Sequence, residues 1–221
     1  MIEHNVAQGS YEWLQLRLGI PTASEFDKIL TPKTLKVSSQ ARGYAYRLVA
    51  EKLLGRPIEN LSNLPWIERG KELEAQAVKS YEFDTDFETR AVGFITTDDG
   101  RIGASPDRLL IGVNGAVEIK CPAPATHIGY LLDGFGTDYI LQAQGQMLVG
   151  GFDFIDRYSY HPELPPFRER TTRDETIIDA LRNALRDFSE MIDGMLIIAR
   201  ATGFFDARPV ADVNDVWEDE E

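Results

Sequence analysis

Apolar residues in the first 60 positions recur at the spacing that is typical of helices. Thr22 and Glu25 fit a capping box at the start of a short helix over about 23–30. A longer helix is expected over about 38–54, because a serine can cap its start and a glycine and a proline follow its end. The first part of the chain is therefore expected to be helical.

The segment after Pro65 predicts a third helix, because Leu73, Ala77 and Tyr81 repeat at i, i+4 and i+8 on one face. Over 88–120 the period changes, and short β-prone runs separated by turn-forming segments predict an antiparallel meander. The remainder is expected to form a helix over about 138–149, a strand over 153–160 and a long amphipathic helix over 173–200. These elements predict an α/β fold with a central mixed β-sheet flanked by helices.

The length of 221 residues is enough to bury one sizeable core, and no repeat or clear linker divides the chain. We expect a single domain over 1–203 and an acidic C-terminal extension over 204–221, which holds seven acids and one arginine. No apolar run approaches the roughly 20 residues of a membrane span, and the N-terminus lacks a signal-peptide pattern. A cytoplasmic protein without a membrane partner is expected.

The net charge of −13 argues at first against a nucleic-acid partner, because phosphate binding relies on lysine and arginine. The charge is unevenly spread, however. Residues 28–56 hold seven basic residues and one acid, Glu51. Two interpretations stay open: a local basic surface on an acidic body, or an ordinary solvated helix face.

The cysteine and histidine content excludes several kinds of site. Cys121 is the single cysteine, which excludes an internal disulfide and a four-cysteine iron–sulfur cluster. His4, His127 and His161 are widely separated, so no zinc-type ligand spacing is present. Any metal in this protein must therefore be held by oxygen.

Three residues that can carry chemistry lie close together in the middle of the chain. Asp107 follows a proline at the start of one predicted strand, and Glu118 and Lys120 lie near the end of the next. Alternation along a strand points Glu118 and Lys120 to the same side, while Ile119 packs into the opposite face. A hairpin can then bring Asp107 beside Glu118.

Two neighbouring carboxylates repel each other in a low dielectric, and a hard divalent cation relieves that repulsion. Such a cation acidifies bound water and takes up charge that develops on a phosphoryl group. Lys120 is placed to orient the attacking water or to stabilise the pentavalent state. The pattern favours metal-dependent phosphodiester hydrolysis, but in isolation it is also typical of an exposed hairpin with a surface ion pair.

Asp107 followed by Glu118-Ile119-Lys120 matches the signature of the PD-(D/E)xK nucleases. Four further segments resemble the lambda exonuclease and YqaJ branch of that superfamily, in the family's order: WLQLRLGIPTASEF at 13–26, RGKELEAQA at 69–77, GASPDRLL at 103–110 and YILQAQGQMLV at 139–149. The resemblance covers most of residues 11–160. It implies a restriction-endonuclease-like core.

The resemblance also implies a metal site. Asp107, Glu118 and the carbonyl of Ile119 are expected to bind the catalytic Mg²⁺, with Mn²⁺ as a substitute, and Lys120 is expected to be catalytic.

Two helical positions are implied to complete the catalytic site. Glu74 resembles the family's helical acid near the second metal position, although without the resemblance it would be interpreted as a solvated carboxylate. Gln142 matches the family's glutamine that helps to hold the nucleophile or the terminal phosphate. Gln146 lies four residues on along the same face and is an alternative.

Arg17, Ser24 and Ser105 match the positions that build a pocket for a 5′-phosphate. Arginine offers a bidentate fork to phosphate, and hydroxyl groups donate to its oxygens. The alternative interpretations are a surface ion pair of Arg17 with Glu12 or Glu25, and a capping role for Ser24.

The implied activity is 5′ to 3′ exonucleolytic digestion of duplex DNA ends, as in phage recombination, which leaves 3′ single strand for an annealing protein. A ring-shaped homotrimer is implied in the same way, as is a phage or prophage origin in a bacterial host. Two alternatives stay open. One is a structure-specific or other endonuclease on the same core, and the other is a non-catalytic DNA-binding subunit.

Overall fold

The computed structural model describes residues 1–58 and 65–203, with residues 65–72 described by their backbone alone. The predicted acidic extension over 204–221 lies outside the described residues. The elements are, in chain order, β1 (Ile2–His4), α1 (Tyr11–Arg17), the 3₁₀ helix η1 (Ala23–Lys28), α2 (Ala41–Leu54), α3 (Pro65–Thr85), β2 (Thr89–Ala91), β3 (Phe94–Thr96), β4 (Gly103–Ala104), β5 (Arg108–Leu110), β6 (Gly115–Lys120), α4 (Pro124–Asp133), α5 (Ile140–Gly150), β7 (Phe154–His161), β8 (Leu164–Thr172) and α6 (Glu175–Ala201).

The central sheet has five strands in the order β2-β5-β6-β7-β8. Strands β6 and β7 are parallel, and the other neighbouring pairs are antiparallel, so the sheet is mixed. Strands β1, β3 and β4 form a separate antiparallel sheet. The single meander predicted over 88–120 is therefore wrong in part, because β3 and β4 leave the central sheet and form a second sheet in which β3 pairs with the N-terminal strand β1.

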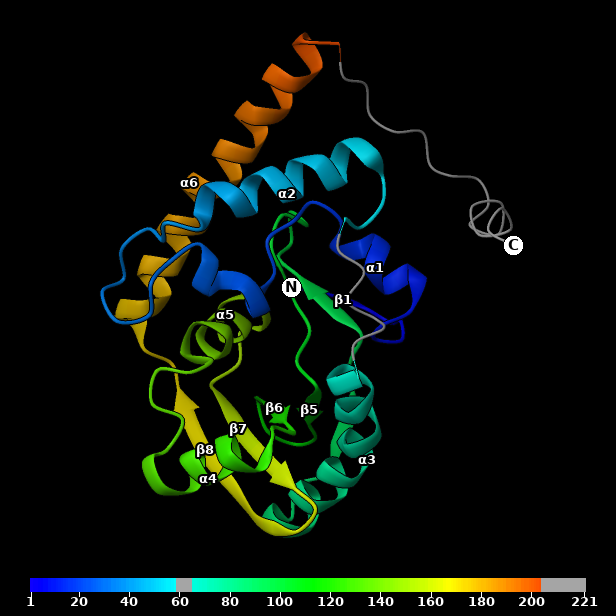
Figure 1. Cartoon of the computed structure of the whole chain (residues 1–221), viewed down its shortest axis with the longest axis vertical. Coiled ribbons are helices and arrows are strands. Elements are labelled where there is room, and N and C mark those ends of the chain that lie inside the picture. The colour runs from blue at the N-terminus through cyan, green and yellow to red at the C-terminus, as the bar shows by residue number, and fades with distance from the viewer. Residues whose placement is uncertain (59–64, 204–221) are drawn as a thin grey trace.

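Helices cover both faces of the central sheet (Figure 1). Helix α3 packs against β6 and β7 on one face, where Val117 and Ile119 join Ala77 and Tyr81 in a buried cluster. Helix α5 packs against β7 from the other face. Since successive residues of β6 point to opposite faces, Glu118 points toward α5. The predicted α/β fold with a mixed sheet flanked by helices is confirmed.

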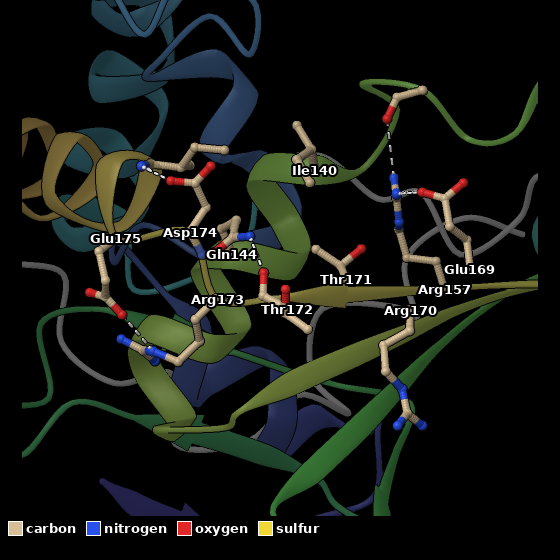
Figure 2. Close-up of a pocket in the computed structure, with 12 residues that line it drawn as sticks. Ile140, Gln144, Arg157, Glu169, Arg170, Thr171, Thr172, Arg173, Asp174 and Glu175 are labelled. Atoms are coloured by element: carbon tan, nitrogen blue, oxygen red, sulfur yellow. Dashed lines mark hydrogen bonds and ion pairs between the residues drawn. The ribbon is translucent and has the colours of Figure 1, made fainter.

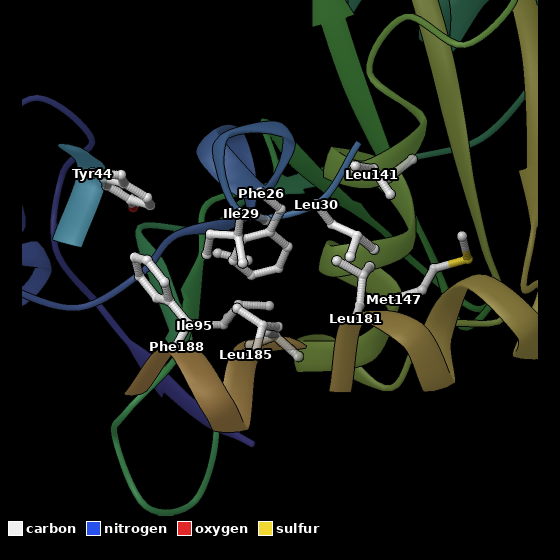
Figure 3. Packing of buried hydrophobic residues seen from close by; sticks show 14 of the residues in the cluster. Phe26, Ile29, Leu30, Tyr44, Ile95, Leu141, Met147, Leu181, Leu185 and Phe188 are labelled. Atoms are coloured by element: carbon white, nitrogen blue, oxygen red, sulfur yellow. The ribbon is translucent and has the colours of Figure 1, made fainter. Parts of the chain in front are cut away.

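The main core lies between η1, α2, α5 and α6 (Figure 3). Phe26 of η1 and Met147 of α5 are fully buried there, as are Leu181 and Leu185 on the inner stripe of α6. This packing holds η1 against α5, and so determines where the polar side chains of both elements lie.

The predicted helices within the first 60 residues are confirmed in position. The predictions of α3, α5, α6 and the strand β7 are confirmed as well. Strand β8 was not predicted. It begins next to Pro165 and Pro166, which interrupt a strand pattern but are tolerated at the start of an edge strand.

The capping box predicted for Thr22 and Glu25 is wrong. The Thr22 side chain makes no capping hydrogen bond, and the element that follows is a 3₁₀ helix. The Glu25 carboxylate instead binds Lys28 at 2.8 Å and the guanidinium of Arg47. A local ion pair with Lys28 and a long-range one with Arg47 have thus replaced the predicted capping contact of Glu25.

Within the described residues, none of the helices combines the length and the apolar character that crossing a bilayer requires.

Candidate active site

Asp107 and Glu118 come from neighbouring strands. Asp107 lies directly before β5, Glu118 lies in β6, and the two strands pair with Arg108 opposite Val117. Asp107 Oδ2 accepts a 2.5 Å hydrogen bond from the backbone N–H of Ile119. The hairpin therefore brings the two acids together, as the spacing in the sequence predicted.

Three side-chain donors converge on the Glu118 carboxylate, which is only 4% exposed. Lys120 Nζ and Gln142 Nε2 both donate to Oε1, each at 2.6 Å. Gln146 Nε2 donates to Oε2 at 2.5 Å. Every predicted residue of this cluster is present, and the two glutamines that competed for one role both bind Glu118, at different oxygens.

The two acids and the lysine are electrostatically coupled. Burial raises the pKa of Asp107 well above its ordinary value, and the charge of Glu118 raises it further, while Lys120 acts in the opposite direction. Burial alone would lower the pKa of Lys120, but Glu118 and Asp107 outweigh that effect and raise it. Lys120 is therefore a protonated ammonium group at neutral pH.

This donor set fits a hard divalent cation. The raised pKa of Asp107 comes first from its burial and second from repulsion by Glu118, and a cation between the two carboxylates would relieve that repulsion. In the described residues, no three histidine, cysteine, aspartate or glutamate side chains cluster as a complete ligand set. The Ile119 carbonyl or solvent must then supply further oxygen ligands. Glu74 is exposed on α3, and its charge makes a smaller contribution that also raises the pKa of Asp107.

The Arg17 guanidinium contacts three hydroxyl groups. It donates to Thr22 Oγ1 at 3.1 Å, and to the Oγ atoms of Ser24 and Ser105 at 3.5 Å each. Burial lowers the pKa of Arg17 to about 10, which leaves it charged at neutral pH. The alternative of an ion pair between Arg17 and Glu25 is wrong, because Glu25 binds two other cations.

Sequence reasoning missed two residues of this pocket. Thr22 had been interpreted as a helix cap, whereas its hydroxyl group is the nearest of the three to Arg17. Trp13 stacks under the guanidinium at 4.1 Å and donates from Nε1 to Ser105 Oγ at 3.0 Å. The segment at 13–26 contained both residues, but only the folded chain brings Ser105 to them.

A pocket of about 480 Å³ is lined by residues of both groups. Ser24 lines it, together with Lys120, Gln142 and Tyr139. The Lys120 ammonium lies 4.7 Å from the centre of the Tyr139 ring. An anionic chain that reaches Ser24 can therefore also reach the lysine.

Gly145 allows the close approach of α5 and η1 that forms this pocket. A Cβ atom at this position would lie 2.4 Å from Phe26 Cδ2. Only glycine therefore fits between the two elements at their present separation.

A larger, shallow depression of about 640 Å³ lies elsewhere, between α5, β8 and the start of α6 (Figure 2). Four of its charged groups form two ion pairs: Arg157 binds Glu169, and Arg173 binds Glu175 at 3.0 Å. None of the carboxylate cluster lines it. It is therefore separate from the site described above.

Comparison with known proteins identifies relatives. The model of a family described as the YqaJ-like viral recombinase domain matches residues 12–153, a range that contains every residue of the two groups. A comparison with curated proteins gives no match.

Solved structures of exonucleases are among those similar to this chain. An alkaline exonuclease (LHK-Exo) from Laribacter hongkongensis is 31% identical, with a TM-score of 0.77, over 87% of this chain and 97% of that chain. A structure of LHK-Exo in complex with dAMP is 32% identical, with a TM-score of 0.76, over 87% and 98%. A phage related exonuclease from Haemophilus somnus 129PT has a TM-score of 0.65 at 16% identity, over 81% and 96%, which shows a shared fold alone.

Proposed function

We propose, from the premise that this chain belongs to the family of YqaJ-like viral recombinase domains, that it is a metal-dependent exonuclease that digests duplex DNA from its 5′ ends. The similarity to an alkaline exonuclease along nearly the whole of that chain supports nuclease activity on DNA. The observation that carries the proposal is the cluster of Asp107, Glu118 and Lys120, together with the pocket that Lys120 shares with Ser24, a residue that binds Arg17.

In this proposal Asp107, Glu118 and the carbonyl of Ile119 hold Mg²⁺, for which Mn²⁺ can substitute, and Glu74 acts near a second metal position. When bound, the ion acidifies water and neutralises charge on the scissile phosphate. Carboxylate and carbonyl oxygens are ligands that these ions prefer.

Lys120 and Gln142 act on the reacting phosphate. The protonated Lys120 stabilises the negative charge that grows on the phosphoryl oxygens as water attacks phosphorus. Gln142 has a second amide hydrogen with which to orient the attacking water. The bond from phosphorus to the 3′ oxygen breaks, and a mononucleotide with its 5′-phosphate is released. The LHK-Exo complex with dAMP, a nucleotide of that type, supports this product.

Arg17 and the hydroxyl groups around it bind the 5′-phosphate of the substrate end. Arg17 supplies charge, and the Ser24 and Ser105 hydroxyl groups, whose oxygens accept from the guanidinium, can donate their own hydrogens to the phosphate. Each cleavage leaves a new 5′-phosphate on the shortened strand, so the reaction regenerates the group that the pocket recognises. A requirement for this group would restrict the enzyme to free 5′ ends.

A DNA partner is compatible with the net charge of −13. In the basic stretch 28–56, Lys28 and Arg47 bind Glu25, whereas Lys33, Lys36 and Arg42 are exposed. These exposed cations supply a local positive surface for the phosphate backbone.

The wider biological proposal follows from the family. The enzyme would act in the cytoplasm of a bacterial host, as part of phage or prophage recombination, and would leave 3′ single strand for an annealing protein. A ring-shaped homotrimer around the duplex would support processive digestion. The acidic extension over 204–221 has no assigned role in this proposal.

The proposal is tested with linear duplex DNA that carries a label at one 5′ or one 3′ end, in Mg²⁺ and in EDTA. Release of 5′-labelled mononucleotide first, in Mg²⁺ alone, is expected. Early release from the 3′ end would contradict the polarity, and cutting of a covalently closed circle would favour an endonuclease. DNA binding without any metal-dependent cleavage would indicate a non-catalytic subunit.

A further inference from the structure

Gln146 is the most deeply buried polar residue in contact with the carboxylate cluster. It is 0% exposed, and it follows Gln142 by one turn of α5. Its Nε2 donates to Glu118 Oε2, which is the oxygen that Lys120 and Gln142 leave unbound. Gln146 is therefore placed to control the orientation of Glu118.

The two glutamines differ in what they can reach. Gln142 lines the pocket that opens toward Ser24, so it can contact a substrate. Gln146 does not line that pocket, and its side chain is enclosed by the protein. An effect of Gln146 on the reaction must therefore pass through Glu118.

The amide of Gln146 can face Glu118 in one orientation only. An ionised carboxylate accepts hydrogen bonds, so the NH₂ group must point to it, because the carbonyl oxygen would repel it. The Gln146 Oε1 atom is then buried without a hydrogen-bond partner among the described residues. Buried polar atoms are usually paired, and an unpaired one at an active site calls for a functional reason.

The forces on Glu118 are unequal without this contact. Lys120, which carries the only positive charge among its three donors, and Gln142 both bind Oε1. With nothing on Oε2, the carboxylate could rotate until both oxygens faced the ammonium group. The hydrogen bond from Gln146 to Oε2 opposes that rotation, which would change the direction in which Glu118 presents its oxygens to a cation shared with Asp107.

We propose that Gln146 is a positioning residue that fixes the Glu118 carboxylate in the orientation that binds the metal. This inference rests on the proposed function, since it assigns the role of Gln146 to the same metal site. Residues that hold a metal ligand through a hydrogen bond commonly change metal affinity by 10- to 100-fold, roughly, when they are replaced.

The test compares Gln146→Met with Gln144→Met. Gln144 is a matched control because it lies on the same helix, is 1% exposed, and binds Thr172 and Asp174 instead of the carboxylates. Mn²⁺ binding is measured by calorimetry on each folded protein without DNA. Gln146→Met is expected to raise the Kd for Mn²⁺ by about tenfold or more, and Gln144→Met is expected to leave it within twofold.

A second measurement separates positioning from a general loss of structure. The activity of Gln146→Met on linear duplex is expected to recover as Mn²⁺ is raised to saturation, with the KM for DNA unchanged. If Gln146→Met does not fold, Gln146→Asn takes its place, because it keeps the amide but shortens the side chain by one methylene and so weakens the contact with Glu118.

An unchanged Kd for Mn²⁺ in a folded Gln146 variant would overturn the inference while leaving the proposed function intact. The same holds for a loss of activity that saturating Mn²⁺ does not restore. Absence of Mn²⁺ binding by the unmodified protein would overturn the proposed function, and the inference with it.

Discussion

The carboxylate of Asp107 accepts a 2.5 Å hydrogen bond from the backbone N–H of Ile119, the residue between Glu118 and Lys120. This contact ties the acid of one strand to the strand that carries the other acid and the ammonium group. The three side chains therefore share one rigid hairpin, and their relative positions do not depend on a mobile loop. Substitutions at these positions should affect the chemistry more than the fold.

Asp107→Asn and Glu118→Gln are each expected to lower cleavage of linear duplex by at least about a hundredfold, because several kcal/mol of metal-supplied stabilisation are lost. Circular dichroism should show an unchanged fold, since the amide of each variant can keep hydrogen bonds of the acid it replaces. Activity within a few-fold of the unmodified protein would contradict the metal site.

The stability of the metal-free protein should depend on pH through Asp107. Its pKa in the folded protein is raised by burial and by Glu118, so the neutral carboxyl group stabilises the fold at low pH, and this contribution is lost as pH rises through the raised pKa. Asp107→Asn keeps a neutral side chain at every pH. In EDTA its Tm should exceed that of the unmodified protein at pH 8 but not at pH 4, and an equal difference at both pH values would refute this explanation.

Arg17→Ala should reduce the preference for a 5′-phosphorylated end over a 5′-hydroxyl end by about tenfold to a hundredfold, because hydrogen bonds to a charged group contribute about 1.5–3 kcal/mol. The measurement is the ratio of kcat/KM for the two substrates, which cancels general losses of activity. Arg182→Ala, at an exposed position on α6, is the control. Equal degradation of both kinds of end by the unmodified enzyme would contradict the assignment of a 5′-phosphate pocket.

Lys120→Ala should lower kcat by about a hundredfold or more while it changes the Kd for DNA little, since the ammonium group acts on charge that develops in the transition state. Exposed Lys79 on α3 offers a control of the same charge change, Lys79→Ala. An effect confined to the Kd for DNA would show that Lys120 binds DNA and does not act in the chemical step.

Gly145→Ala should destabilise the protein by about 1–3 kcal/mol, because the added methyl group overlaps the Phe26 ring. Gly129→Ala is the matched control, since this glycine lies in α4 with nothing within 4 Å of an added Cβ. The control should be neutral or stabilising, because alanine favours helix over glycine. Chemical denaturation measures both free energies of unfolding.

The carboxylate cluster could be predicted from the sequence because its geometry is local. Strand alternation relates Glu118 to Lys120, and one short hairpin brings Asp107 to them. The helices were predicted because their apolar spacing is also a local property.

The rest of the site depends on contacts between distant segments. Thr22 fitted a capping box, and only the position of Arg17 reveals its other hydrogen bond. Trp13 is 92 residues from Ser105, so no local pattern relates the two. Gln142 and Gln146 lie on one helix face, and only the packing of α5 on the sheet shows that each binds its own oxygen of Glu118.

Because Gly145 has no side chain, the Phe26 ring of η1 packs directly on the backbone of α5. The proposed 5′-phosphate pocket and the carboxylates are thereby held at a fixed distance from each other. In the proposed exonuclease, the packing of α5 against η1 would then determine how many nucleotides are released in each turnover. Step size would be the same for every base sequence that enters.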